Sequence, residues 1–525
     1  MAPSARRRTP PTVTLSGSAL ADSPLLTDGS LDAVAVPVAP GREGDEGLAA
    51  GSGTAQAAAR YGIDLAELAE RSGLTGAAGE SSVVQLPRPV GSAVALPWTD
   101  LPPRIVLVGV GQGSDTDLRR AGAALARASR GWRAVATTLG DDDHAASSDV
   151  ARRTRALVEG YLLAAYAQPS GAHKDTAKAA AELVLLGRDG GRVGAAVVAA
   201  RTAASATWLV RDLANTPSGV KNPAWVADQA RRLATRAGVS VEVLGPRELA
   251  AQGFGGILAV GGGSASTPRL VVARYTPPQP AAHHVVVVGK GITYDTGGLS
   301  IKPRESMVPM KTDMAGAAVA LATVLGAAHS GSVHRVTAVL PLAENQVGAA
   351  SYRPDDVVRL YGGTTVEVQN TDAEGRMVLA DALAYADAVL DPDVLIDVAT
   401  LTGAATLGLG RGHAALYGTD DDLVRALTAA GQATGELAWP MPLSAEYQDS
   451  LRSDVADVRQ TARDKHMGGG SVFAALFLQR FVGTRRWAHL DVAGTARATA
   501  DAHEVTAGAT GYGARLLLQY LADLS

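Results

Sequence analysis

Short apolar strands alternate with helical stretches along most of this chain, and that alternation restricts its fold more than any other feature. In the second half, HHVVVVG, HRVTAVLPLAEN, VLIDVATLTG and WAHLDVAG are near-continuous apolar runs, as expected of strands that are covered on both faces. Helical patterns such as WVADQARRLATRAG and MVLADALAYADAVL fall between them. This order predicts an α/β fold with a mixed sheet covered by helices. TTVEVQN and GGILAVGGG are predicted to be further strands.

The chain has 525 residues, which is too long for one ordinary domain and fits two α/β domains. Residues 31–200 are predicted to form a smaller N-terminal Rossmann-like or macro-like α/β domain that ends in a linker helix. Residues 152–213 have a largely helical pattern, and the prolines of NTPSGVKNPAW then break it. A larger C-terminal α/β domain is predicted over residues 212–525.

Residues 1–30 are predicted to be a disordered segment. MAPSARRRTPPT is basic and rich in proline and serine, and such a composition buries too little apolar surface to offset the entropy of ordering. No apolar core of a secretory signal follows it, so we expect a cytoplasmic protein.

The composition excludes several classes of function. Cysteine is absent, which rules out a disulfide framework, a thiol nucleophile and a cysteine zinc site. The formal net charge of −4 and the 4% aromatic content argue against a nucleic-acid partner. The longest apolar run, GAAVALATVLGAA, is shorter than the ~20 residues of a membrane span and is predicted to be a buried helix. We therefore expect no membrane association.

Two acids, Asp372 and Glu374, lie two residues apart in the run NTDAEGRMVLADALAYA, between a predicted strand and a predicted helix. A turn at the carboxyl end of a strand in an α/β sheet opens into the usual ligand crevice. The positive end of the helix dipole favours carboxylates there. Acids are also common caps of first helical turns, so this pair alone leaves a structural role equally open.

Other acids and cations have the same placement. Asp295 and Asp313 flank a strand end and a helix start, and so do the cations Lys290, Lys302 and Arg376. Four carboxylates in one crevice repel one another unless cations lie among them, and hard divalent metals take oxygen ligands in this way. Two divalent ions would neutralise the four acids. Lys302 and Arg376 would then remain as a positive surface for a substrate or an anion.

The motifs of other hydrolases are missing from the sequence. None of the ten histidines lies in an HExxH motif, since His329 and His334 lack its spacing and its glutamate. Ser264 in GGGSAS lacks the final glycine of a GxSxG elbow. Carboxylate-bound metal therefore remains the strongest hydrolytic chemistry.

Two glycine-rich segments imitate nucleotide-binding loops. Gly289-Lys290 resembles the end of a P-loop, but position 284 is histidine and no serine or threonine follows the lysine. In VGVGQG, residues 108–113, Ser114 stands where the third glycine of the dinucleotide fingerprint belongs. Neither segment is expected to bind a nucleotide.

Five segments resemble signatures of the leucyl aminopeptidase (cytosol aminopeptidase) family, in the right order and with fitting spacing. They are GKGITYDTGGLSIKP, MKTDMAGAA, NTDAEGRMVLADAL, DVATLTGA and WAHLDVAGTA. The match runs from roughly Arg211 to the C-terminus, and NTDAEGR is highly specific to the family. Residues 1 to about 200 resemble the family's variable N-terminal domain only in their strand–helix pattern.

The resemblance implies a metal-dependent enzyme that removes unblocked N-terminal residues from peptides, with two metal ions per subunit, Mn²⁺ or Zn²⁺. Matched residue by residue, Asp295 and Glu374 would bridge the ions, Asp372 would also bind one of them, and Asp313 and Lys290 would bind the other. A lysine ligand must lose its proton, which two adjacent divalent charges favour.

The same resemblance assigns the remaining roles. Lys302 would donate to the oxyanion, and Arg376 would hold a bicarbonate ion that relays a proton. The pocket for the first side chain would be lined by Met310, Thr400, Leu401, Gly403, Ala493 and Ala496. Its small or soft apolar side chains predict a broad, leucine-like preference.

Family members form hexamers, so a homohexamer is expected here. Two alternatives stay open at this point. One is a metal-dependent dipeptidase, such as one acting on Cys-Gly. The other is an additional DNA-binding role, which some family members have and against which the net charge of this chain weighs.

Overall fold

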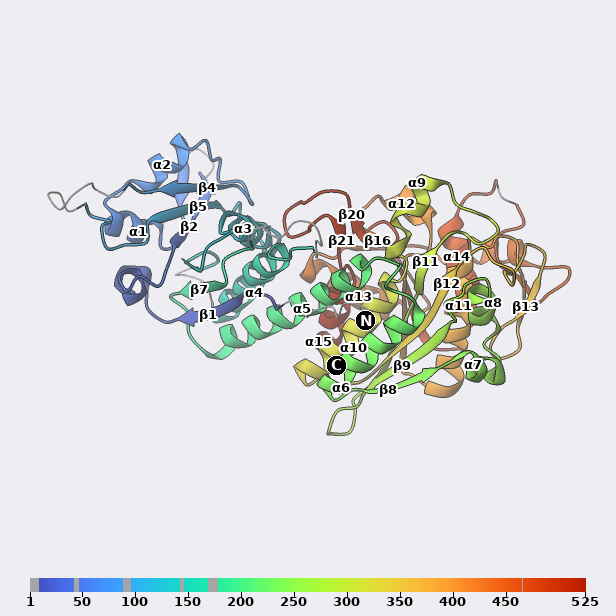
Figure 1. The fold of residues 1–525 in the computed structure, drawn as a ribbon. Helices are drawn as coiled ribbons and strands as arrows, with labels where there is room; N and C mark the ends of the chain where they lie inside the picture. The colour runs from blue at the N-terminus through green and yellow to red at the C-terminus, as the bar shows by residue number, and fades with distance from the viewer. Residues whose placement is uncertain (1–8, 42–46, 88–95, 142–145, 169–177, 465) are drawn as a thin grey trace. The chain divides into compact units, whose positions relative to one another are not determined.

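The computed structural model describes residues 9–41, 47–87, 96–141, 146–168, 178–464 and 466–525. They form two compact units (Figure 1). Among the described residues, the N-terminal unit contains those from 9 to 205 together with 500–506, and the C-terminal unit contains residues 206–499 and 507–525. Residues 500–506, which lie within the predicted C-terminal domain, thus belong to the N-terminal unit.

The N-terminal unit is built on a seven-stranded sheet with the order β1-β7-β6-β2-β5-β4, in which β3 pairs with β2. Neighbours from β1 to β5 are parallel, whereas β4 and β3 are antiparallel to their partners. The strands are β1 (Thr12–Ser16), β2 (Ala33–Pro40), β3 (Leu48–Ala50), β4 (Ser81–Gln85), β5 (Arg104–Gly109), β6 (Ala134–Thr137) and β7 (Glu182–Leu186). The helices are α1 (Thr54–Tyr61), α2 (Leu65–Arg71), α3 (Asp115–Ala128) and α4 (Ser147–Ala164), with short turns η1 (Leu20–Asp22) and η2 (Pro24–Leu26). The long helix α5 (Gly191–Asn215) begins in this unit, and its residues from 206 onward belong to the C-terminal unit.

Two expectations for this unit are wrong. The predicted disordered segment 1–30 contains β1, which pairs in parallel with β7; residues 1–8 lie outside the described part. The stretch 152–213, predicted to be largely helical, contains β7 between α4 and α5. Each of these short strands is stabilised by a partner far away in the sequence, and a short apolar run by itself does not distinguish strand from helix.

The glycine-rich loop after β5 leads into α3 through a cap. The Ser114 side chain accepts a hydrogen bond from the Asp117 backbone N–H, and the Asp117 carboxylate accepts one from the Ser114 N–H, both at 3.2 Å. This capping box satisfies backbone donors at the start of the helix. Ser114 therefore has a structural role at the position where a dinucleotide fingerprint has its third glycine.

The C-terminal unit contains a mixed nine-stranded sheet with the order β17-β16-β19-β15-β10-β12-β9-β8, in which β11 pairs with β12. Its strands are β8 (Ser240–Leu244), β9 (Arg269–Tyr275), β10 (His284–Gly289), β11 (Gly291–Asp295), β12 (Arg335–Asn345), β15 (Val394–Ala399), β16 (Ala414–Gly418), β17 (Ala438–Pro440) and β19 (Arg486–Asp491). A three-stranded sheet joins β13 (Val357–Arg359), β14 (Thr365–Glu367) and β18 (Val458–Arg459), and a two-stranded one joins β20 (Arg497–Ala498) and β21 (Gly508–Ala509).

Helices cover both faces of the large sheet (Figure 1). The helices of this unit after α5 are α6 (Pro223–Ala237), α7 (Pro246–Gln252), α8 (Gly255–Gly261), α9 (Arg304–Met307), α10 (Ala315–Ser330), α11 (Glu374–Tyr385), α12 (Gly403–Leu409), α13 (Asp421–Thr434), α14 (Gly470–Gln479) and α15 (Ala514–Asp523). Shorter turns are η3 (Val308–Thr312), η5 (Ala445–Leu451) and the π-helical η4 (Ala386–Leu390).

The four consecutive valines of β10 explain how the sheet is buried on both faces. Val285 and Val287 pack in a core with α6, α10, α13 and α15, whereas Val286 and Val288 pack in a second core with α8, α11 and α14. Successive side chains of a strand point to opposite faces, so an uninterrupted apolar run fits a central strand. Burying each valine stabilises the fold by about 1.5–3 kcal/mol.

Two predicted strands of this unit differ from the structure. GGILAVGGG forms the helix α8, whose Ile257 N–H donates to the buried Asp381 carboxylate of α11 at 2.8 Å. TTVEVQN contributes only β14, which belongs to the three-stranded sheet. In both cases contacts with distant segments decide a conformation that the local pattern leaves ambiguous.

By length and composition alone, the helical stretches 191–215 and 304–330 could cross a membrane. The most apolar part of the second stretch is 78% buried and includes α10, the predicted buried helix. A core helix of a globular unit passes the same test.

Candidate active site

The site lies where neighbouring strands of the large sheet end. Strands β10, β15 and β19 are adjacent and parallel, so their carboxyl ends meet at one edge. Lys290 follows β10, Thr400 follows β15, and Asp491 ends β19. Asp295 ends β11, which runs parallel to β12. This edge is where ligands bind in open α/β sheets.

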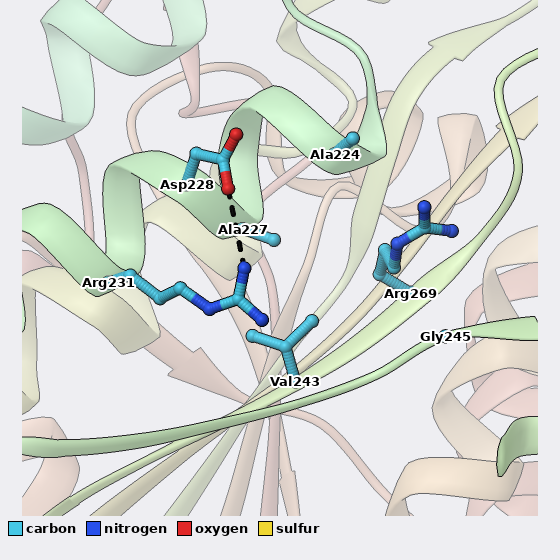
Figure 2. A pocket seen from close by; sticks show the side chains of 7 residues that line it. All are labelled: Ala224, Ala227, Asp228, Arg231, Val243, Gly245 and Arg269. Atoms are coloured by element: carbon cyan, nitrogen blue, oxygen red, sulfur yellow. Dashed lines mark hydrogen bonds and ion pairs between the residues drawn. The ribbon is translucent and has the colours of Figure 1, made fainter.

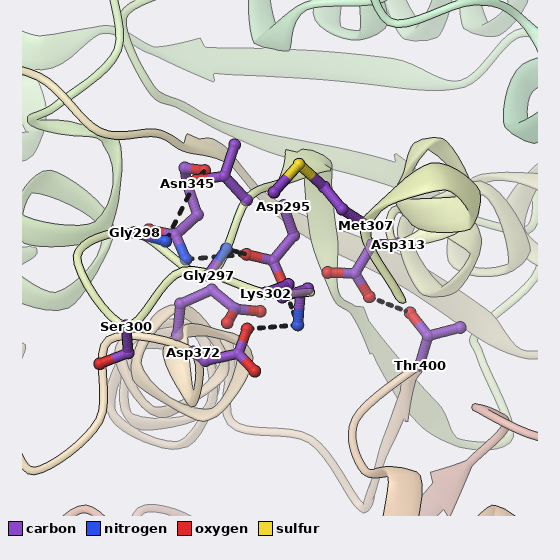
Figure 3. A network of polar contacts seen from close by, with 12 residues as sticks. Asp295, Gly297, Gly298, Ser300, Lys302, Met307, Asp313, Asn345, Asp372 and Thr400 are labelled. Carbon is purple, nitrogen blue, oxygen red and sulfur yellow. Dashed lines mark hydrogen bonds and ion pairs between the residues drawn. The ribbon is translucent and has the colours of Figure 1, made fainter. Parts of the chain in front are cut away.

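The structure brings the four predicted acids together. Figure 3 shows three of them, Asp295, Asp313 and Asp372. Asp295, Asp372 and Glu374 each offer one carboxylate oxygen, and these oxygens lie within 4.8 Å of one another. Asp313, just before α10, joins them through Lys290, whose Nζ lies 3.0 Å from Asp313 Oδ1 and 2.9 Å from Glu374 Oε1.

Lys290 is enclosed at the centre of this cluster. Besides its two carboxylate partners, its Nζ donates to the Thr400 carbonyl at 2.9 Å. Burial alone lowers the pKa of this ammonium, but the charges of Asp313, Glu374 and Asp295 raise it above its ordinary value. The side chain is therefore a protonated ammonium here, and it would have to release that proton to bind a metal.

Lys290 packs closely against the backbone of two glycines. A Cβ added to Gly375, the residue after Glu374, would lie 2.5 Å from Lys290 Cε and 2.7 Å from its Nζ. At Gly316 in α10, an added Cβ would lie 2.8 Å from the Lys290 backbone nitrogen. A residue larger than glycine at position 375 or 316 would therefore collide with Lys290.

Gly375→Ala is therefore expected to displace the Lys290 ammonium and to weaken binding of divalent metal. We expect the affinity for divalent metal to fall about 10–100-fold, as it does when groups that orient metal ligands are removed. Calorimetric titration of the metal-free protein with Mn²⁺ measures it. Gly194→Ala is the matched control, because an added Cβ there meets nothing within 4 Å. Metal affinity equal to that of the control would show that Lys290 does not need this space.

Lys302 lies on the more open side of the cluster. Its ammonium forms an ion pair with Asp295 Oδ2 at 2.8 Å and another with Asp372. The side chain is 13% exposed, against 4% for Lys290. Gly297 and Gly298 adopt left-handed φ values of 86° and 61°, which turn the chain so that it returns toward the acids.

The residues present fit a cation. Oδ2 of Asp313 and Oε2 of Glu374 are buried without a hydrogen-bond donor. Burial, together with the charge of Asp295, raises the pKa of both Glu374 and Asp313 above their ordinary values. Two lysines thus leave four acids incompletely neutralised. A set of carboxylate oxygens with one amine suits Mn²⁺ or Zn²⁺.

Arg376 lies one helical position beyond Gly375 and is buried. Its Nη1 donates to the Gln460 carbonyl at 2.8 Å, and its Nε has no acceptor. Burial lowers the pKa of the guanidinium to about 10. Within the described part of the chain it forms no ion pair closer than 4.0 Å, so it does not directly neutralise Asp372 or Glu374.

The residues predicted to line a substrate pocket lie along the same edge. Met310 is in η3, just before Asp313, and Gly403 begins α12. Thr400 donates through Oγ1 to Asp313 Oδ1 at 2.7 Å, and Leu401 follows it. Ala493 and Ala496 follow β19, and Ala496 is buried in the core beside α10.

Two residues that support the site were not predicted. Asn345 donates through Nδ2 to Asp295 Oδ1 at 2.8 Å and to the Thr371 carbonyl at 3.0 Å. Asp491 accepts hydrogen bonds from the backbone N–H groups of Leu401 and Ala493, both at 3.1 Å. These contacts orient a cluster acid and two loops of the predicted pocket. No local sequence signal identified them, because Asn and Asp are common at strand ends for other reasons.

A separate cavity of about 260 Å³ lies between α6, β8 and β9 (Figure 2). It is lined by Ala224, Ala227, Asp228, Arg231, Val243, Gly245 and Arg269. It shares no residue with the acid cluster, and Arg231 is paired with Asp228 at 3.5 Å. It therefore contributes nothing to the chemistry of the cluster.

Comparison with known proteins relates both units to one family. Residues 208–518 match the domain described as "Cytosol aminopeptidase family, catalytic domain". Residues 35–170 match the one described as "Cytosol aminopeptidase family, N-terminal domain". A probable cytosol aminopeptidase of Leifsonia xyli subsp. xyli is 42% identical, with 98% of this chain and 99% of the relative covered. One of Streptomyces avermitilis is 41% identical, over 94% of this chain and 96% of the relative.

Solved structures show the same fold. The bottromycin maturation enzyme BotP in complex with Mn superposes with a TM-score of 0.80 at 35% identity, covering 94% of this chain and 99% of that one. A mutant of tomato leucine aminopeptidase gives a TM-score of 0.84 at 28% identity, with 98% of both chains covered.

Proposed function

Because the chain belongs to the cytosol aminopeptidase family and is thus a metal-dependent aminopeptidase, we propose that its acid cluster binds two divalent ions and cleaves unblocked N-terminal residues from peptides. The observation that carries this proposal is the convergence of Asp295, Asp372 and Glu374 within 4.8 Å, with Asp313 attached through Lys290. The family relation supports the activity, and the geometry of the cluster supports these residues as its site.

Asp295 and Glu374 would be shared between the two ions, Asp372 would complete one ligand set, and Asp313 and Lys290 the other. The related enzyme BotP has been solved in complex with Mn, which supports Mn²⁺, and the donor set also suits Zn²⁺. When bound, such ions acidify a water molecule and polarise the scissile carbonyl.

Lys302 is proposed to donate a hydrogen bond to the substrate oxygen on which negative charge develops. Its greater exposure supports this role, because a side chain that the protein covers less is more accessible to a peptide. Lys290 is enclosed on every side by protein and is suited to a ligand role instead. A preorganised donor stabilises developing charge more effectively than water does.

Arg376 is proposed to hold a bicarbonate ion that relays a proton, since no other general base is evident. Its buried guanidinium, with a free Nε–H and no carboxylate partner within 4.0 Å among the described residues, supports an anion partner. Arg376→Ala is expected to lower kcat by about 10²–10⁴-fold or less, in the range of general base catalysis. It should also remove any stimulation by added bicarbonate. Equal stimulation of mutant and wild type at saturating metal would reject the relay.

The substrate pocket proposed from Met310, Thr400, Leu401, Gly403, Ala493 and Ala496 predicts a broad preference for apolar, leucine-like first residues. A panel of aminoacyl amides, assayed with reconstituted metal, is expected to show the fastest cleavage for leucine and methionine. N-acetylated versions should not be cleaved, because a free amine is required. Cleavage of N-acetylated amides at comparable rates would contradict an aminopeptidase.

Two further assays separate the alternatives. A Cys-Gly-type dipeptidase would cleave Cys-Gly and fail on leucine amide. A DNA-binding role would appear as a salt-dependent shift of DNA in a gel, which we do not expect at a net charge of −4.

We also propose a cytoplasmic homohexamer. The cytoplasmic location is supported by the name cytosol aminopeptidase that relatives carry. Closed symmetry is the usual outcome for soluble homo-oligomers. Light scattering across a dilution series tests the hexamer, and a monomer at all concentrations would exclude it.

A further inference from the structure

Gln460 is a fully buried neutral residue that contacts the turn carrying two of the cluster acids. It follows β18, about ninety residues beyond that turn in sequence, and its exposed fraction is 0%. Its side-chain Oε1 accepts hydrogen bonds from the backbone N–H groups of Gln369 and Asn370, both at 3.1 Å. Its Nε2 donates to the Ala373 carbonyl at 2.9 Å.

These three bonds span the turn from its beginning to its end. β14 ends at Glu367, so the N–H groups of Gln369 and Asn370 lie beyond its ladder. An unpaired N–H costs about 1–3 kcal/mol when it is buried. Ala373 stands between Asp372 and Glu374, and the direction of its peptide group therefore affects where both carboxylates point.

The backbone of Gln460 is attached to the same region. Its N–H donates to the Glu367 carbonyl at 3.0 Å, and its carbonyl accepts from Arg376 Nη1 at 2.8 Å. One residue thus holds the strand before the turn, the turn itself and the arginine after it. Within the described part of the chain, the Gln460 carbonyl is the acceptor found for the Arg376 guanidinium.

We propose that Gln460 is a positioning residue that holds Asp372, Glu374 and Arg376 in one fixed arrangement for metal binding and catalysis. Among the described residues, its side-chain hydrogen bonds go to backbone groups of the turn and none of them goes to a carboxylate, so it acts through the turn. Its amide is suited to the task because it supplies an acceptor for two donors and a donor for one carbonyl. The inference rests on the proposed function of the cluster as a metal site.

Gln460→Met tests the proposal, because it keeps the length of the side chain and removes all three side-chain hydrogen bonds. Metal affinity is expected to fall about 10–100-fold, as when groups that orient ligands are lost. At saturating Mn²⁺, kcat is expected to remain below wild type while KM changes little. Calorimetric titration of the metal-free protein gives the affinity, and it is read independently of activity.

Gln519→Met is the matched control. Gln519 is 9% exposed in α15 and donates to Asp523 at 2.8 Å, outside the cluster. It should lower the melting temperature and leave metal affinity and kcat unchanged. Gln460→Glu keeps the two accepted bonds and loses the one donated to Ala373, so its metal affinity should lie between those of Gln460→Met and wild type. If Gln460→Met does not fold, the proposal is tested by comparing the metal affinity of Gln460→Glu with that of Gln519→Met.

Metal affinity and kcat of the Gln460 variants within twofold of the control, with only the melting temperature lowered, would overturn the proposal. A failure of the proposed function would be seen differently. In that case the wild type itself would bind no Mn²⁺ or Zn²⁺, or would bind metal without cleaving any amide.

Discussion

Removal of divalent metal is expected to abolish the aminopeptidase activity of this protein, and added Mn²⁺ or Zn²⁺ is expected to restore it. The reason is the set of four acids at the edge of the sheet, with which Lys290 and Lys302 are the only cations paired among the described residues. Bound divalent ions would lower the pKa of a water molecule and polarise the scissile carbonyl, which the carboxylates and lysines described here do not do to the same extent. Activity against leucine amide and metal content by mass spectrometry, measured on the same samples, check this expectation.

Glu374→Gln is the sharpest variant for the same test. The substitution keeps the size of a side chain that is 1% exposed, but it removes the charge proposed to be shared by both ions. It should lose activity and metal binding far more completely than it loses stability. Full activity of demonstrably metal-free wild type would refute metal dependence itself.

Glu436→Gln provides the contrast. Glu436 is also 1% exposed, but it pairs with Arg515 at 3.2 Å and accepts backbone hydrogen bonds from Gly513 and Leu516. Breaking a buried pair of this kind costs about 3–5 kcal/mol of stability. This variant should therefore melt earlier and still bind metal with wild-type affinity.

Lys302→Met is expected to lower kcat by about 10²–10³-fold, or about 3–4 kcal/mol, the usual loss of one oxyanion donor. Metal content and KM should change little, because an interaction made mainly in the transition state affects kcat and kcat/KM alike. Steady-state kinetics at saturating metal, with metal content measured in parallel, test this. Lys178→Met, at an exposed position of the N-terminal unit, is the control.

The ion pairs of Lys302 with Asp295 and Asp372 define the competing outcome. If Lys302 acts only by neutralising these acids, Lys302→Met would change metal affinity, and excess metal would restore kcat to wild type. Such a rescue would reject the oxyanion role.

The sequence by itself predicted the layered α/β fold, because the apolar period of a strand or a helix is a local property. The valines of β10 and the apolar run of α10 are examples: each is buried where its pattern indicates. The residue types in NTDAEGR and GKGITYD likewise pointed to metal chemistry before any geometry was known. Those types are constrained by the chemistry they can perform.

The errors fall where local pattern is ambiguous and distant partners decide. Residues 12–16 become a strand only through pairing with β7, and the segment 182–186 is a strand rather than a helix for the same reason. GGILAVGGG becomes α8, whose first turn is held by Asp381 from α11. A short apolar run satisfies its backbone hydrogen bonds either way, so the available partner selects the conformation.

Only the tertiary structure decided how the site is supported. Asn345, Asp491 and Gln460 lie far in sequence from the groups they hold, and their residue types do not identify them as parts of a metal site. The backbone groups to which these three side chains hydrogen-bond are set by strand register and by the path of each loop. Each side chain is only several ångströms long, so its partner must lie close to it in the folded chain. The sequence could therefore name the groups that perform the chemistry, because that depends on what they are. It could not name the groups that hold them in place, because that depends on where the folded chain leaves a buried donor or acceptor without a partner.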